Sequence, residues 1–255
     1  MKDSNRLWAV NIRPKIVVVM PAYNAQKTVL ATYNDLPKDL IFEVILVDDA
    51  SKDETIKKAN QLGISVYEHK ENKGYGGNQK TCYDEALKRN PDVVVMVHPD
   101  YQYDAGLVGV LCEPIVNGRA DIMLGSRIQT RQQVLAGGMP IWKYFANRFL
   151  TLFENLAMGL NLSEYHTGFR AYRTKVLKTV PYDKFSDDFV FDQQILISAL
   201  SHGFNISEIP VPCKYFKEAS SINFIRSTKY GLLTLWTVFL YLLNQTKIIK
   251  NSLFK

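Results

Sequence analysis

The segment VVVMVHPDYQY, residues 93–103, ends an apolar run with a histidine and an aspartate. His98 and Asp100 are two positions apart, so in an extended backbone their side chains point to the same side. Together they can bind one divalent ion that bridges two phosphates, and the imidazole shifts the preference from Mg²⁺ toward Mn²⁺. Alternatively, Pro99 simply ends a strand and His98 is a half-buried residue whose hydrogen bonds are satisfied. The segment therefore suggests a metal site without requiring one.

Two adjacent carboxylates, Asp48 and Asp49, end a second apolar run, EVILVDD. One of them can accept hydrogen bonds from a nucleobase or its ribose. In the other interpretation Ser51 or Asp49 caps the next helix, and Glu54 completes a capping box with Ser51. The two interpretations remain open on spacing alone.

A glycine-rich segment, GYGGN at residues 74–78, precedes a predicted helix. The N–H groups at a helix start suit phosphate, so Gly76 and Gly77 are candidate phosphate contacts. The segment lacks the full dinucleotide fingerprint and the GK[ST] of a P-loop, so a plain turn is an equally good interpretation.

Cationic side chains follow the ends of later segments and can surround a diphosphate or an acceptor phosphate, although most surface arginines have no such role. The candidates are Arg127 in GSR, Lys143 and Arg148 in WKYFANR, and Arg170 in TGFR.

Three carboxylates open the predicted helix FDQQILISALSHG and its approach. Asp192 falls near the buried side of the first turn, beside the positive end of the helix dipole, where it can cap the helix or act as a general base. Asp187 and Asp188 are expected to be caps.

Strand-like apolar runs alternate with helical patterns in the first part of the chain, which indicates an α/β fold with a mostly parallel sheet covered on both faces. In such sheets ligands bind beyond the carboxyl ends of the strands. The polar segments that follow the strands are therefore expected at one edge of the sheet: PAYNA (21–25), DDAS (48–51), NKGYGGN (72–78) and HPDYQYD (98–104).

The rest of the chain predicts one catalytic domain over residues 1–217 and a C-terminal helical segment over 218–255. The loop TRQQVLAGGMP is a candidate mobile lid. The most apolar long stretch, residues 230–244, is shorter than the roughly 20 residues that span a bilayer. This segment can lie on a membrane surface, pack on its own domain or join a second subunit.

Composition narrows the classes of partner and the setting. The formal net charge is +6, but the basic residues are scattered and no nucleic-acid motif is present, so no nucleic-acid partner is expected. Three cysteines without a CxxC pattern indicate neither a zinc site nor a disulfide framework, which favours a reducing cytoplasm. The N-terminal residues have no apolar stretch typical of a secretory signal.

As a set, these motifs resemble the GT-A-fold, family-two glycosyltransferases, and among them the dolichyl- or polyprenyl-phosphate sugar synthases. The resemblance covers roughly residues 15–217 and is carried by VVVMPAYNA, EVILVDDASKDET, NKGYGGN, VVVMVHPDYQYD, DIMLGSR, HTGFRAYR, FDQQIL and SEIPVPCKYF. It implies inverting transfer of a sugar from a UDP- or GDP-linked donor to a polyprenyl phosphate or a sugar hydroxyl. It also implies a Mn²⁺ or Mg²⁺ ion.

The resemblance assigns roles to particular positions. Asp100 corresponds to the second acid of the family's metal-binding DxD motif, and His98 stands where the first acid is expected. Asp192 falls at the position of the acid that deprotonates an acceptor hydroxyl. The implied contacts to nucleotide, diphosphate or acceptor phosphate are Pro21, Ala22, Tyr23, Asn24, Asp48, Asp49, Gln102, Arg127, Arg148 and Arg170.

The histidine removes one negative charge from the expected metal shell, so metal affinity should fall. A catalytically weak nucleotide-sugar or carbohydrate binder of the same fold is therefore an alternative. A sugar-nucleotide nucleotidyltransferase is less favoured. Those enzymes have a glycine-rich GxGTR loop after the first strand, and this chain has PAYNA at that place.

Overall fold

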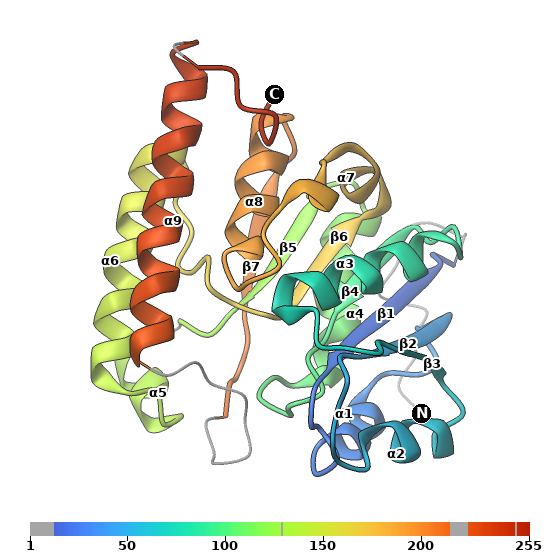
Figure 1. Cartoon of the computed structure of the whole chain (residues 1–255). Helices are drawn as coiled ribbons and strands as arrows, with labels where there is room; N and C mark the ends of the chain where they lie inside the picture. Colours follow the sequence, from blue (N-terminus) through green and yellow to red (C-terminus); the bar gives the residue numbers. More distant parts are fainter. Residues whose placement is uncertain (1–12, 129, 215–223, 248) are drawn as a thin grey trace.

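The computed structural model describes residues 13–128, 130–214, 224–247 and 249–255, and in these residues seven strands form one mixed sheet (Figure 1). Their order across the sheet is β3-β2-β1-β4-β6-β5-β7. The strands are β1 (Ile16–Ala22), β2 (Glu43–Asp48), β3 (Ser65–Glu68), β4 (Val93–Met96), β5 (Ile122–Ser126), β6 (Arg170–Arg173) and β7 (Ile206–Pro210).

Most strand pairs are parallel, as predicted. β6 is the exception, since it runs antiparallel to both of its neighbours, β4 and β5. All seven residues of β1 are buried, which agrees with a central strand covered on both faces. The predicted α/β class is confirmed.

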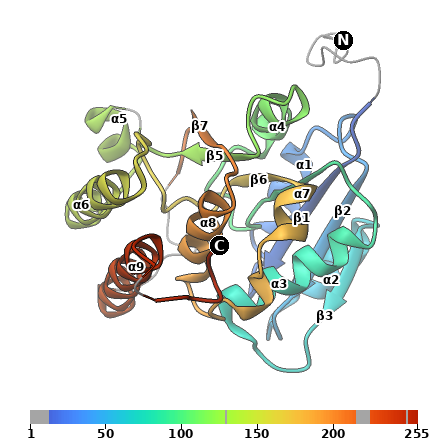
Figure 2. The same cartoon turned by 90° about the horizontal axis from the view of Figure 1, so that it is seen from above.

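Helices cover the two faces of the sheet in separate layers (Figure 2). One layer contains α1 (Val29–Asp35), α2 (Thr55–Gln61) and α4 (Val108–Val116), and the other contains α3 (Gly74–Leu87), α7 (Thr174–Thr179) and α8 (Phe191–Ser201). The candidate lid contains a short helix, α5 (Arg131–Ala136).

Two longer helices, α6 (Ile141–Met158) and α9 (Phe224–Gln245), lie side by side outside α8 (Figures 1 and 2). The predicted domain boundary at residue 217 falls outside the described residues, so its position stays a prediction. None of the described helices combines the length and apolar character needed to cross a bilayer.

The helix starts differ from the predicted caps. The hydroxyl of Ser51 accepts the Asn24 backbone N–H at 2.7 Å, whereas α2 begins at Thr55, whose N–H donates to the Asp53 carboxylate at 2.9 Å. The predicted capping box is therefore wrong, because its serine is used to hold the loop after β1. No side chain caps α8, so the capping roles expected of the two aspartates before it are also wrong.

The glycines of GYGGN serve helix packing. The N–H groups of Gly76 and Gly77 donate to the backbone oxygen of Asp187 at 2.7 and 3.4 Å. A Cβ on Gly76 would overlap the backbone oxygen of Ser186 and approach the Cβ of Phe191 to 2.8 Å. These contacts correct the predicted phosphate role, because both N–H groups are already used inside the fold.

This close approach predicts a stability defect in Gly76→Ala. We expect the free energy of unfolding to fall by about 3 kcal/mol, because backbone must shift to admit the methyl group. Urea unfolding measures the change. Gly231→Ala in α9 is the control: its Cβ would meet Leu150 at an ordinary 3.6 Å, so stability should hold or rise. Equal stability of Gly76→Ala and wild type would refute the packing role.

Candidate active site

In the described part of the chain, two cavities adjoin at the carboxyl ends of the strands. The larger has a volume of about 650 Å³ and the smaller about 160 Å³. Both are lined by Tyr75, His98, Asp100, Phe189 and Tyr230. A ligand in one cavity is thus separated from a ligand in the other by a single shared wall.

The larger cavity gathers the residues predicted to hold a nucleotide. The loop after β1, the carboxylate that follows β2 and the end of β4 all contribute. From the predicted set, the lining includes Pro21, Ala22, Tyr23, Asn24, Asp49 and Asp100. Asp48 does not line it: this residue is fully buried, and its carboxylate accepts the Ser51 N–H at 2.8 Å.

Asp49 is held rigidly at the wall of the larger cavity. Its carboxylate accepts the N–H groups of Lys73 and Gly74 at 2.8 and 3.1 Å and contacts His69 Nδ1 at 2.7 Å. His69 Nε2 in turn lies 3.0 Å from the hydroxyl of Thr81. The sequence interpretation missed His69, which fixes the orientation of the carboxylate expected to contact the nucleobase.

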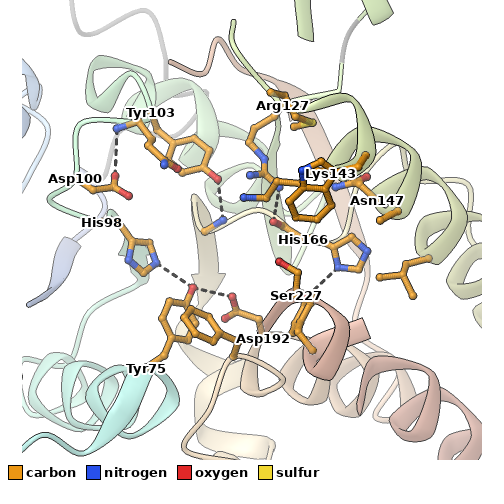
Figure 3. A pocket seen from close by; sticks show the side chains of 18 residues that line it. Tyr75, His98, Asp100, Tyr103, Arg127, Lys143, Asn147, His166, Asp192 and Ser227 are labelled. Atoms are coloured by element: carbon orange, nitrogen blue, oxygen red, sulfur yellow. Dashed lines mark hydrogen bonds between the residues drawn. The ribbon is translucent and has the colours of Figure 1, made fainter. Parts of the chain in front are cut away.

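A hydrogen-bond chain crosses the shared wall (Figure 3). The Tyr75 hydroxyl lies 2.8 Å from Asp192 Oδ2 and 3.2 Å from His98 Nε2. An ionised carboxylate can only accept, so the single tyrosine proton goes to Asp192, and neutral His98 must carry its proton on Nε2. The nitrogen that retains a lone pair is therefore Nδ1.

The surroundings of His98 keep the imidazole neutral. Burial lowers its pKa to about 4, although the nearby Asp192 carboxylate opposes this shift. The ring stacks on Tyr75 with centroids 5.4 Å apart, and a Cβ at Gly168 would come within 2.7 Å of the imidazole. A neutral, tightly packed imidazole remains suitable as a metal ligand.

The donor set at the end of β4 fits a divalent ion only in part. The described residues contain no cluster of three or more carboxylate, histidine or cysteine side chains placed to hold a metal. Asp100 supplies one carboxylate, oriented by the Gln102 N–H at 3.1 Å, and His98 supplies one nitrogen. An ion here would need its remaining ligands from a diphosphate and water, as a substrate-bound metal does.

The smaller cavity has cationic side chains on its wall. Arg127 and Lys143 (Figure 3) line it, and so does Gln102. Burial would raise the pKa of Glu164, but Arg127, held against it by hydrogen bonds and charge, lowers it. Burial, together with the charge of Arg127, lowers the pKa of Lys143. Lys143 and the ion-paired Arg127 can contact an anionic group from this wall, which Asp100 and Asp192 also line.

Two of the predicted phosphate contacts are not on either cavity wall. Arg170 is fully buried, and its guanidinium donates to backbone oxygens of Thr167, Asp192 and Tyr165 at 2.6, 2.8 and 3.0 Å. Arg148 donates to the backbone oxygen of Ser163 at 2.7 Å. The geometry corrects both assignments, because these guanidinium groups bind the protein's own backbone.

The C-terminal helix α9 supplies part of both walls, which the sequence interpretation missed. Arg226, Lys229, Tyr230 and Leu233 line the larger cavity, and Tyr230 and Ser227 line the smaller one. The spacing of these residues, i, i+3, i+4 and i+7, is that of one helix face and was the available signal. The C-terminal helix is therefore part of the candidate site.

Comparison with known proteins identifies the family of this chain. Residues 17–180 match the Glycosyl transferase family 2. The UDP-N-acetylglucosamine–dolichyl-phosphate N-acetylglucosaminyltransferase of Methanococcus voltae is 26% identical over 217 residues, covering 78% of this chain and 86% of that protein. The undecaprenyl-phosphate mannosyltransferase of Micrococcus luteus is 26% identical over 208 residues, covering 77% and 82%.

The fold also has a crystallographic counterpart. Glucosyl-3-phosphoglycerate synthase from Mycobacterium tuberculosis, crystallised with Mn²⁺, UDP and glucosyl-3-phosphoglycerate, superimposes with a TM-score of 0.71 at 17% identity, covering 93% of this chain and 83% of that one. The likeness confirms the predicted GT-A fold. Because the family match extends over most of the sheet and its connecting loops, this chain belongs to glycosyl transferase family 2.

Proposed function

We propose that this glycosyltransferase moves a sugar, with inversion, from a nucleoside diphosphate sugar to a polyprenyl phosphate. The supporting observation is the pair of adjoining cavities, of which the smaller carries Arg127 and Lys143. A donor in the larger cavity and a phosphate in the smaller one meet at the wall formed by Tyr75, His98 and Asp100.

The proposed donor is a UDP- or GDP-linked sugar. The loop after β1 and Asp49 would hold its nucleoside, and Asp100 and His98 would hold a Mn²⁺ or Mg²⁺ ion, which would supply positive charge to the diphosphate. Such an ion neutralises charge on the leaving diphosphate. The M. tuberculosis synthase, which was crystallised with Mn²⁺ and UDP, supports this assignment by its fold.

In the reaction, an acceptor oxygen attacks the anomeric carbon from the face opposite the diphosphate. A bond forms between that oxygen and the carbon while the bond from the carbon to the diphosphate breaks, and the diphosphate leaves with the electron pair. The site positions the two substrates and excludes water, which accounts for much of the expected rate gain.

Asp192 favours a phosphate acceptor over a hydroxyl. Its carboxylate accepts hydrogen bonds from the Tyr75 hydroxyl at 2.8 Å and the Gln79 amide at 3.1 Å, and the Arg170 guanidinium lies 3.5 Å away. With donors on both oxygens, this carboxylate is poorly placed to take a proton from an acceptor hydroxyl. A phosphate acceptor is already an anion and needs no base.

Asp192→Asn tests the choice of acceptor. We expect transfer to a polyprenyl phosphate to stay within about tenfold of wild type, because asparagine still accepts the Tyr75 hydrogen bond and no proton transfer is lost. If the acceptor were a sugar hydroxyl, loss of the base would cost roughly 10²–10⁴-fold in rate. The measurement is transfer of labelled sugar from UDP- and GDP-sugars to each acceptor, with thermal unfolding as the check on folding.

The setting is also a proposal. A polyprenyl phosphate is held in a membrane, so the enzyme would work at the cytoplasmic face as a peripheral protein. The relatives from M. voltae and M. luteus, named for lipid-phosphate acceptors, support this setting.

A further inference from the structure

Helix α6 has its polar and apolar faces reversed relative to an ordinary surface helix. Asn147, Thr151 and Glu154 are buried, whereas Phe149 and Leu156 are 62% and 77% exposed. Ordinary surface helices bury the apolar stripe and expose the polar one. A reversed helix of 18 residues indicates that something apolar covers the outer face.

Helix α9 repeats the reversal beside α6. Thr234 and Thr237 are buried, and Leu232, Trp236 and Phe239 are exposed at 64%, 55% and 47%. Their spacing of four and three residues places the exposed side chains in one stripe. α6 and α9 lie next to each other at the outer edge of the molecule (Figure 2), so the two exposed stripes are neighbours on its surface.

The charges on these helices indicate which kind of partner could bury the exposed apolar side chains. Across α6 and α9 the ionisable side chains of Lys, Arg, Asp and Glu are Lys143, Arg148, Arg226, Lys229 and the buried Glu154. Lys229 pairs with Asp188 at 2.6 Å, and Lys143 and Arg226 line the cavities beside these stripes. Four cations against the buried Glu154 give the two helices a net charge of +3 and no exposed acid. Positive charge at the cavity edge of the apolar face favours an anionic lipid surface as its cover.

The apolar face is continuous with the smaller cavity. Trp142 and Ala146 of α6 are exposed at the surface and also line that cavity. A chain attached to a phosphate beside Lys143 could therefore leave along α6 without crossing a polar surface. This continuity links the face to the proposed lipid-phosphate acceptor.

We propose that the outer stripes of α6 and α9 form a docking surface that lies flat on an anionic bilayer. The face, defined by Phe149, Leu156, Leu232, Trp236 and Phe239, enters the boundary between headgroups and acyl chains. Helices of 18 and 22 residues give a contact about 30 Å long. The reason for an enzyme to bind a bilayer rests on the proposed function, but the binding itself can be tested without any sugar transfer.

Flotation with lipid vesicles tests the surface. The full chain is mixed with vesicles of phosphatidylcholine, with or without phosphatidylglycerol, in the absence of donor and acceptor. The variant Leu156→Ser/Leu232→Ser removes one exposed leucine from each helix. The matched control, Leu30→Ser/Val110→Ser, removes residues that are 50% and 46% exposed on α1 and α4.

We expect wild type and the control to float with phosphatidylglycerol vesicles and to bind phosphatidylcholine alone more weakly. The α6–α9 variant should lose roughly tenfold or more of its binding, because two leucines no longer leave water. Thermal unfolding should be the same for all three proteins.

Three outcomes would overturn the proposal: wild type fails to float, the α6–α9 variant floats as well as wild type, or the control variant loses binding equally. A wild-type dimer in sedimentation that this variant converts to monomer would also overturn it, since the cover would then be a second copy. Because the assay contains no substrate, its failure is distinguishable from failure of sugar transfer.

Discussion

Asp100→Ala is expected to lower kcat/KM for sugar transfer by about 100-fold, while the protein stays folded. Among the described residues, Asp100 is the only carboxylate that lines both cavities. It is partly exposed, so its loss would remove negative charge at the proposed diphosphate position without opening the core. Removal of a group that stabilises transition-state charge typically costs this much. The donor with Mn²⁺ should raise the unfolding temperature of wild type but not of Asp100→Ala, because a ligand that no longer binds does not stabilise the folded state.

Asp104→Ala is the matched control for this variant. Asp104 lies in the same loop but is exposed, and its carboxylate only accepts the N–H of Gly106 at 3.0 Å. Activity of this control should remain near that of wild type. Full activity of Asp100→Ala with every donor tested would eliminate the proposed metal and diphosphate site.

Arg170→Met has the largest expected effect on stability. The guanidinium is fully buried, satisfies three backbone oxygens and lies 3.5 Å from Asp192. Its removal takes one donor from each of these oxygens, although Tyr165 O keeps the Gln193 amide at 3.3 Å, and it leaves Asp192 without its ion pair. The free energy of unfolding should fall by about 3–5 kcal/mol. Urea unfolding at neutral pH measures the loss.

Arg148→Met provides the comparison, because that guanidinium is partly exposed and donates to the backbone oxygen of Ser163. We expect a change of about 1 kcal/mol or less. A small loss in Arg170→Met, equal to that of Arg148→Met, would show that Arg170 does not organise the buried wall behind Asp192.

The sheet was predictable because its evidence is local. β1, β2 and β4 are short apolar runs followed by polar residues, and the loops after these three strands do meet at one edge. The direction of β6 was not predictable, since HTGFRAYR has the same apolar alternation in either orientation. Strand direction depends on pairing partners that are far away in the sequence.

The candidate site was predictable in part for a similar reason. Asp49 and Asp100 follow strands directly, so the strands themselves place them at the larger cavity. Arg170 and Gly76 could not be assigned correctly, because a buried guanidinium and a close-packed glycine have the same local sequence signal as phosphate contacts. The part played by α9 depends on long-range packing against α6 and α8, which spacing within α9 alone does not specify.

Because the two cavities share a wall, we expect binding of the two proposed substrates to be coupled thermodynamically. Tyr75, His98, Asp100, Phe189 and Tyr230 face both ligands, so any rearrangement that one ligand induces in them changes the free energy of binding the other. Linkage makes this effect reciprocal: the factor by which a bound donor changes acceptor affinity equals the factor by which a bound acceptor changes donor affinity. The His98–Tyr75–Asp192 chain links side chains of this wall by hydrogen bonds and is where we expect such cooperativity to be sensitive to substitution.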